Sequence, residues 1–140
     1  MPERQGIKIV PLIVGALTEA VGSVATGMML VVSLAASGIP DYEILIRMHS
    51  MSGLLLTMIA HLGFAGLGGY FAGEMAGRYP ILHGGIVGAV GLLMAGLCRE
   101  GNLPLWYDLL SLGGMIPAGM AGGAMARPEV SPRHGDGTKR

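Results

Sequence analysis

The sequence is poor in charged residues, aromatic residues and cysteine, and each shortage excludes a class of protein. Charged residues make up 13% of the 140 residues, whereas a soluble domain carries about 25%. The formal net charge is zero, so no basic surface for a nucleic acid is indicated. The single cysteine, Cys98, excludes a disulfide framework and a cysteine-based metal cluster within one chain.

Sequence motifs of catalysis are missing as well. The chain has no HExxH, no G-x-S-x-G, no Walker motif and no GxGxxG placed after a strand. The glycines of Gly66-Leu67-Gly68-Gly69 lie within a helical pattern, where helix packing explains them better. The histidines of the apolar segments occur at different depths, so they cannot converge on one metal ion. We therefore expect no enzymatic activity, no cofactor and no metal site.

The chain is rich in apolar residues and in glycine. Hydrophobic residues make up 51% of it, the mean hydropathy is +0.59, and 25 residues are glycine. Turn signals separate four apolar runs that are long enough to span a bilayer. The first run is too long for the core of a signal peptide, and Glu19 in its middle argues against cleavage. The expected transmembrane helices cover residues 9–36, 44–76, 81–98 and 104–126.

These runs predict an all-α fold: a polytopic membrane protein with a four-helix transmembrane bundle over residues 1–127. Residues 128–140 are polar and rich in proline and glycine, which predicts a disordered cytoplasmic tail.

Glycine is spaced so that these helices can approach one another closely. The second run ends in a double GxxxG motif, which is typical of close helix contacts in lipid. In the third run the glycines alternate between four-residue and three-residue spacing, which is typical of left-handed, coiled-coil-like packing. We expect six glycines to lie at helix interfaces: Gly69, Gly73, Gly77, Gly84, Gly88 and Gly91.

The distribution of positive residues predicts the orientation. Seven Lys and Arg residues lie on the side of the two termini, and only Arg47 and Arg99 lie toward the other side. By the positive-inside rule both termini are expected in the cytoplasm. Trp106 and Tyr107 are then expected at the outer membrane interface, where aromatic residues gather.

Glu19 and His61 are the leading functional candidates within the predicted spans. A charge at the centre of a span costs about 2.5–3.5 kcal/mol on insertion scales, so Glu19 is expected to face the bundle. The first two helices are antiparallel, which places the two residues within about one helical turn in depth. A hydrogen-bonded Glu19–His61 pair is either a structural clasp between helices or a proton relay or ion site, and Thr57 and Thr26 could extend such a relay outward.

Two segments at the end of the second run and the start of the third carry a resemblance to a known family. They are Gly68-Gly69-Tyr70-Phe71-Ala72-Gly73-Glu74-Met75-Ala76-Gly77-Arg78 and His83-Gly84-Gly85-Ile86-Val87-Gly88. This pattern resembles the YrzE-like proteins, a group of small, uncharacterised four-helix bacterial membrane proteins. The resemblance implies the fold but no activity, and its pattern does not include Glu19 or His61. Together with the orientation above, the expected location is the bacterial inner membrane.

The predicted function follows from the balance between small and polar helix faces. The second, third and fourth runs each offer a face of small residues, and four short helices offer one another limited contact area. The surplus faces predict a structural or assembly role, as a homo-oligomer or as a subunit of a larger membrane complex. The expected partners are membrane lipids and other membrane subunits, with no nucleic acid. The alternative is a proton or small-solute channel or transporter that uses Glu19 and His61.

Overall fold

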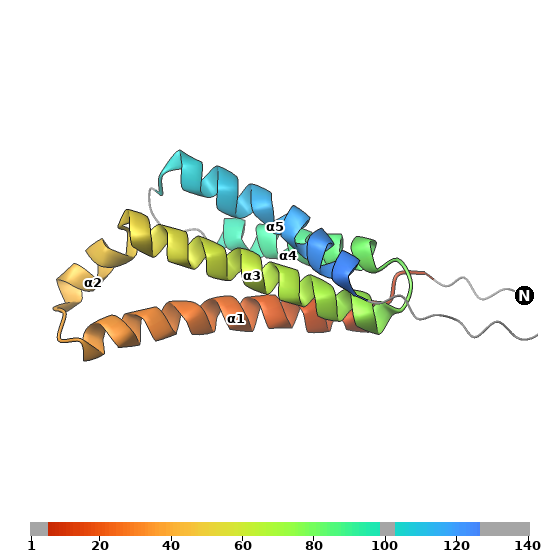
Figure 1. The fold of residues 1–140 in the computed structure, drawn as a ribbon, viewed down its shortest axis with the longest axis horizontal. Coiled ribbons are helices and arrows are strands. Elements are labelled where there is room, and N and C mark those ends of the chain that lie inside the picture. Colours follow the sequence, from red (N-terminus) through yellow and green to blue (C-terminus); the bar gives the residue numbers. More distant parts are fainter. Residues whose placement is uncertain (1–5, 99–102, 127–140) are drawn as a thin grey trace, which may run out of the picture.

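The computed structural model describes residues 6–98 and 103–126, and the regular structure in this part of the chain is entirely α-helical. The all-α prediction is therefore confirmed. The observed bounds of the first helix coincide with the predicted ones, and the last two helices begin and end within one residue of the predicted limits. Figure 1 shows the helices in order: α1 (Ile9–Ala36), α2 (Asp41–Met48), α3 (Met51–Ala76), α4 (Pro80–Leu97) and α5 (Leu105–Met125).

Helix α3 is the central element, because it contacts each of the other four helices. Helix α1 contacts α2, α3 and α4, and within the described residues it makes no contact with α5. The long helices lie close together where α1 and α4 begin and where α3 and α5 end, and α5 diverges from α1 toward α2 (Figure 1). We call these two ends of the molecule the terminal end and the α2 end.

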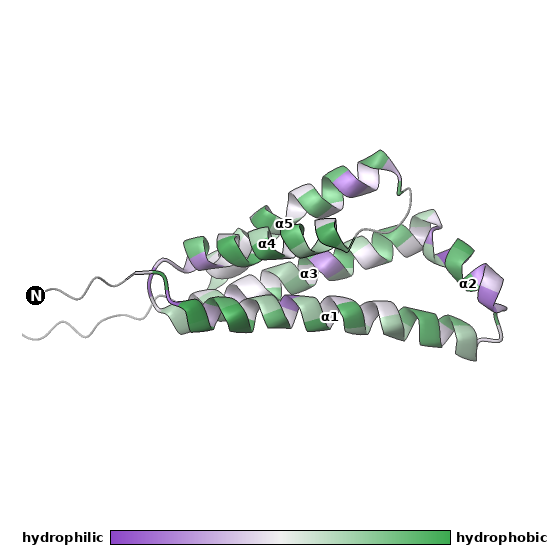
Figure 2. Ribbon diagram, turned by 180° about the vertical axis from the view of Figure 1, so that it is seen from behind, coloured by the Kyte–Doolittle hydropathy of each residue, from purple (hydrophilic) through white to green (hydrophobic). Residues whose placement is uncertain are grey.

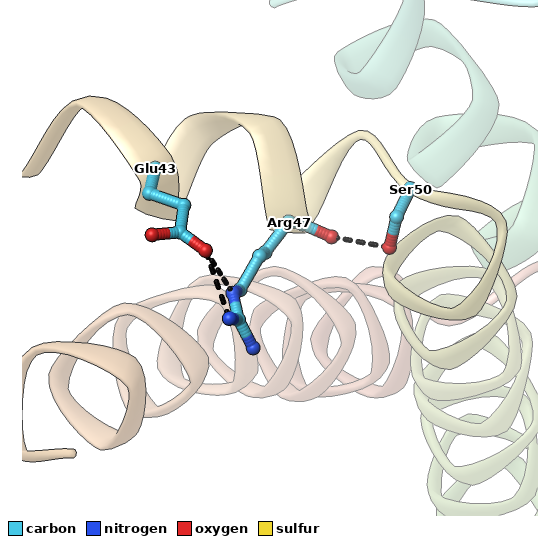
Figure 3. A network of polar contacts seen from close by, with 3 residues as sticks. All are labelled: Glu43, Arg47 and Ser50. Atoms are coloured by element: carbon cyan, nitrogen blue, oxygen red, sulfur yellow. Dashed lines mark hydrogen bonds and ion pairs between the residues drawn. The ribbon is translucent and has the colours of Figure 1, made fainter. Parts of the chain in front are cut away.

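The second predicted helix, residues 44–76, is divided in the structure into α2 and α3. Ser50 makes the division: its hydroxyl donates to the Arg47 carbonyl of α2 over 2.6 Å and accepts from the Gly53 backbone N–H of α3 over 3.3 Å. The serine thereby caps the start of α3. Figure 3 shows the hydrogen bond from Ser50 to the Arg47 carbonyl beside the exposed Glu43–Arg47 ion pair, whose atoms are 2.8 Å apart. The prediction of one continuous helix was wrong, because α2 ends at Met48 and Ser50 caps a new helix that begins at Met51.

Helix α3 ends at Gly77, which the GxxxG pattern placed at a helix interface. Gly77 is instead the C-cap of α3: its φ is +70°, in the left-handed region, and its N–H donates to the Gly73 carbonyl over 3.3 Å. Glycine is the common residue at this position because it has no Cβ. Tyr79 also has a positive φ, +52°, and α4 begins immediately after it at Pro80. The last member of the motif therefore serves to end the helix and reverse the chain.

The other motif glycines bring backbones into contact toward the terminal end. Gly119 of α5 lies between Gly69 of α3 and Gly84 of α4, directly against the backbone of both. A Cβ on Gly15 of α1 would lie 2.6 Å from the Gly68 carbonyl oxygen of α3, closer than real Cβ atoms come. Contacts of this kind are how helices associate where lipid supplies no hydrophobic drive. Four predicted packing glycines lie against the backbone of another helix, and a fifth, Gly91, lies against a side chain of α1; the four are Gly69, Gly73, Gly84 and Gly88.

Hydrophobic residues predominate along the long helices (Figure 2). Many of their side chains are exposed, such as Met29, which is 73% exposed, and Leu97, which is 74% exposed. Helices α1, α3 and α4 are each long and apolar enough to cross a membrane, which indicates a membrane protein. Helix α5 has 21 residues but is not among them; Asp108, Pro117 and several glycines lower its apolar content. The fourth span stays a prediction, and the predicted tail of residues 128–140 lies outside the described residues.

The glycine contacts make a prediction about stability. We expect Gly119→Ala to lower the thermal stability of the protein in lipid or detergent, because the new methyl group would overlap the backbone of α4. Overpacking of this kind costs about 1–3 kcal/mol. The matched control is Gly96→Ala on α4, where a Cβ meets nothing within 4 Å and alanine favours the helix by about 1 kcal/mol. Equal melting temperatures for the two variants would contradict the packing described here.

Candidate functional site around Glu19

The candidate site is built around the carboxyl group of Glu19. Glu19 shares the buried face of α1 with Gly15 and Gly22, one turn to either side, and it is only 4% exposed. Both carboxylate oxygens are buried and have no hydrogen-bond partner among the described residues. An ionised carboxyl group in such surroundings is costly, because no donor among the described residues compensates its charge.

Gly91 of α4 accommodates this carboxyl group. The two carboxylate oxygens and the carbon between them occupy the space that a Cβ on residue 91 would need. The predicted packing role of Gly91 is therefore specific: it makes room for a polar side chain from α1 rather than for another backbone. An alanine at this position would force the carboxyl group to move.

The structure does not join Glu19 to His61 by a hydrogen bond, contrary to the predicted pair. The register of α1 and α3 explains this, since Gly15 lies against Gly68 and Gly22 lies against the Phe64 ring. Glu19 is therefore level with the turn after Phe64, and His61 lies about 6–8 Å nearer the α2 end at 1.5 Å per residue. The sequence argument counted residues from the middle of each helix, and the break at Ser50 shifts that middle.

Thr57 lies where α3 faces α5. Its hydroxyl is 3.3 Å from the Tyr107 hydroxyl and also donates to the Gly53 and Leu54 carbonyls, both at 3.0 Å. Tyr107 is only 7% exposed, so it points into the bundle rather than along the predicted membrane interface. The polar contact of Thr57 is therefore with α5.

Sequence reasoning missed the polar face of α5. Asp108 and Ser111 are 8% and 4% exposed and lie one turn apart, on the same helix face as Met115. The signal was available, because polar residues three apart on an apolar helix share one face. Among the described residues, buried polar or charged side chains thus come from α1 (Glu19), α4 (His83) and α5 (Asp108 and Ser111), and the half-buried Thr57 and His61 lie on α3.

Exposure of the inward-facing positions changes along α1 and the middle of α3, whereas Leu54 of α3 and Ser111 of α5 stay buried toward the α2 end. Toward the terminal end the inward-facing Ala72 and Val87 are 0% exposed. Toward the α2 end the corresponding positions are polar and only half-buried: Thr26 follows Gly22 on α1 by one turn, and His61 precedes Ala65 on α3 by one turn. Glu19 lies at the boundary between the sealed part and the more open part.

The buried imidazole of His83 on α4 connects two segments of the chain. It is 2% exposed, and its Nε2 accepts from the Lys8 backbone N–H over 3.3 Å. Its Nδ1 therefore carries the hydrogen and donates to the Tyr79 carbonyl over 3.0 Å. His83 thus ties the segment before α1 to the start of α4.

Within residues 6–98 and 103–126 no group of three His, Cys, Asp or Glu side chains is placed to hold a metal ion.

Comparison of the chain with protein-family models, with curated proteins and with solved structures finds no match. The resemblance to the YrzE-like proteins therefore stays a prediction.

The contact between Glu19 and Gly91 can be tested by a double-mutant cycle. We expect Gly91→Ala to lower the stability of the protein, because the methyl group displaces the carboxyl group from its place on α4. In a Glu19→Ala background the same change should cost little, since the space is then free. Thermal unfolding of the four proteins measures the coupling. Additive effects of the two substitutions would show that the side chains do not meet.

Proposed function

We propose that this protein is a membrane protein with a structural role, and that it assembles with further copies of itself through the outer surface of α3 and α5. The observation that supports this is a pair of exposed glycines, Gly63 on α3 and Gly113 on α5. A Cβ on either residue would meet nothing within 4 Å. The two glycines flank a point where the helices touch, because Leu62 lies against Gly114.

A glycine inside a helix destabilises it by about 0.5–1 kcal/mol relative to alanine. Most of the glycines in these helices offset that cost by allowing a close contact within the chain. Gly63 and Gly113 have no such contact, which they share with Gly27 and Gly96, and they differ from those two in flanking the Leu62–Gly114 contact. A helix from another molecule would supply the missing neighbour.

The surroundings of the two glycines have the shape that helix packing requires. Ile59 and Leu67, one turn before and after Gly63, are 65% and 49% exposed. Leu109, one turn before Gly113, is 65% exposed. Large side chains around a small residue form a knobs-and-hole surface that an equivalent surface can fill. A second copy is the natural occupant, because a two-fold interface brings the same patch to both sides.

We expect Gly63→Leu to convert the oligomer into a monomer, because the leucine fills the hole while leaving the contacts within one copy intact. The measurement is the molecular mass in mild detergent or in lipid nanodiscs. Gly96→Leu is the matched control: it is also an open glycine, but it lies on α4, and it should leave the mass unchanged. A wild-type protein that is monomeric in nanodiscs, with no bound subunit, would exclude the assembly role.

A second candidate function is a proton or small-solute conduit, and one observation favours it. The unpartnered carboxyl group of Glu19 lies next to half-buried polar residues that continue toward the α2 end, as functional carboxyl groups in membranes often do. Beyond Glu19 the helices are in backbone contact at Gly15 and Gly68, so passage through the bundle would require α1 to move. A conduit predicts proton or solute flux in liposomes that Glu19→Gln abolishes. Equal flux in wild-type and variant liposomes, or none in either, would exclude this function.

A further inference from the structure

Among the described residues, Glu19 is the one side chain with buried polar atoms that lack a partner. In a membrane protein such a group is expensive to keep and marks a functional position. The close fit against Gly91 also shows that the carboxyl group is accommodated rather than misplaced, because a side chain at residue 91 would exclude it. The site is therefore built to hold a carboxyl group whose charge something else must neutralise.

The size and chemistry of the site identify what neutralises the charge. A metal cation requires several ligands, typically oxygen atoms or imidazole nitrogens that converge on it at about 2.0–2.6 Å. Within the described residues Glu19 belongs to no group of three metal-binding side chains, and both carboxylate oxygens are enclosed. A proton needs no additional ligand and no additional volume.

We propose that Glu19 is a reversible proton-binding site that is reached from the α2 end of the bundle. In the binding step one carboxylate oxygen accepts a proton from water, which forms one O–H bond and a neutral carboxyl group. Release breaks that bond and returns the proton to water. The neutral carboxyl group stays against Gly91 as a small, uncharged side chain.

The charged and titratable groups around α1 fit this assignment. On α3 the nearest is His61, about one turn closer to the α2 end; on α4 it is His83, about two turns toward the terminal end and engaged by Lys8 and Tyr79. On α2 the ionic groups are Asp41, Glu43 and Arg47, at the far end of α1. Asp108 belongs to α5, which does not contact α1. No fixed charge therefore lies against Glu19 to take the place of a proton.

The direction of access follows from the gradient in exposure. Toward the terminal end, a Cβ on Gly15 would lie 2.6 Å from the Gly68 carbonyl oxygen and 2.7 Å from a Val87 methyl, so no water fits there. Toward the α2 end, the half-buried Thr26 and His61 offer polar atoms along the path. Protons therefore reach Glu19 past Thr26 and His61.

Infrared difference spectroscopy of the full chain in lipid, across a pH titration, tests the proton site. A protonated carboxyl group has a carbonyl stretch separate from the bands of a carboxylate. We expect a band that appears and disappears with pH in the wild-type protein and in Glu74→Gln, whose carboxyl group is exposed on α3. The band should be lost in Glu19→Gln, a substitution that keeps the shape of the side chain. A titrating spectrum that is unchanged by Glu19→Gln would overturn the proposal.

Cysteine labelling tests the direction of access in a Cys98→Ser background. We expect a small, charged thiol reagent to modify Thr26→Cys in intact proteoliposomes and to leave Ala72→Cys, on the sealed side, unmodified. Modification of Ala72→Cys but not Thr26→Cys would overturn the proposed route. These outcomes are independent of assembly and of transport: a titrating Glu19 band in a protein without flux would support the proton site and exclude the conduit.

Discussion

The close approach of helix backbones at glycine is the constraint on which the rest of this structure depends. Where Gly15 meets Gly68, and where Gly119 lies between Gly69 and Gly84, neither side chains nor water can separate the helices. Dispersion contacts at such short separation replace the hydrophobic drive that lipid cannot provide. Because these contacts gather toward the terminal end, that part of the bundle is sealed, and the helices are free to diverge toward α2.

The same device explains the position of Glu19. Gly91 belongs to the glycine series of α4, but it faces a carboxyl group instead of a backbone. A bundle that used every glycine for helix contact would have no interior room for an ionisable side chain. At Gly91 a carboxyl group takes the place of a backbone contact. Glu19 therefore lies at the edge of the sealed region that faces the α2 end, next to the half-buried polar residues of α3. Packing and chemistry are therefore parts of one arrangement, and the proposed assembly through Gly63 and Gly113 would extend glycine packing to contacts between molecules.

Sequence periodicity predicted the bounds of most helices well, and the register and facing of the helices against one another less well. The bounds of α1 follow from an uninterrupted apolar run between turn signals, and the GxxxG spacing identified Gly69 and Gly73 as contact residues. The break at Ser50 was missed because one hydroxyl group, not the pattern, produces it. The inward position of Tyr107 depends on which face α5 turns to α3, and the distance between Glu19 and His61 depends on helix register. Neither quantity is encoded locally, since both are set by contacts between segments far apart in the chain.

The most direct measurement of the central claim is solid-state NMR of the protein in lipid bilayers, with carbon-13 in glycine alone. Through-space correlations should then connect Gly119 with both Gly69 and Gly84, because their backbones are in contact, while Gly96 should show no correlation with a glycine of another helix. The absence of the Gly119 correlations in a folded sample would contradict the account, since the helices would then be held together by something other than glycine.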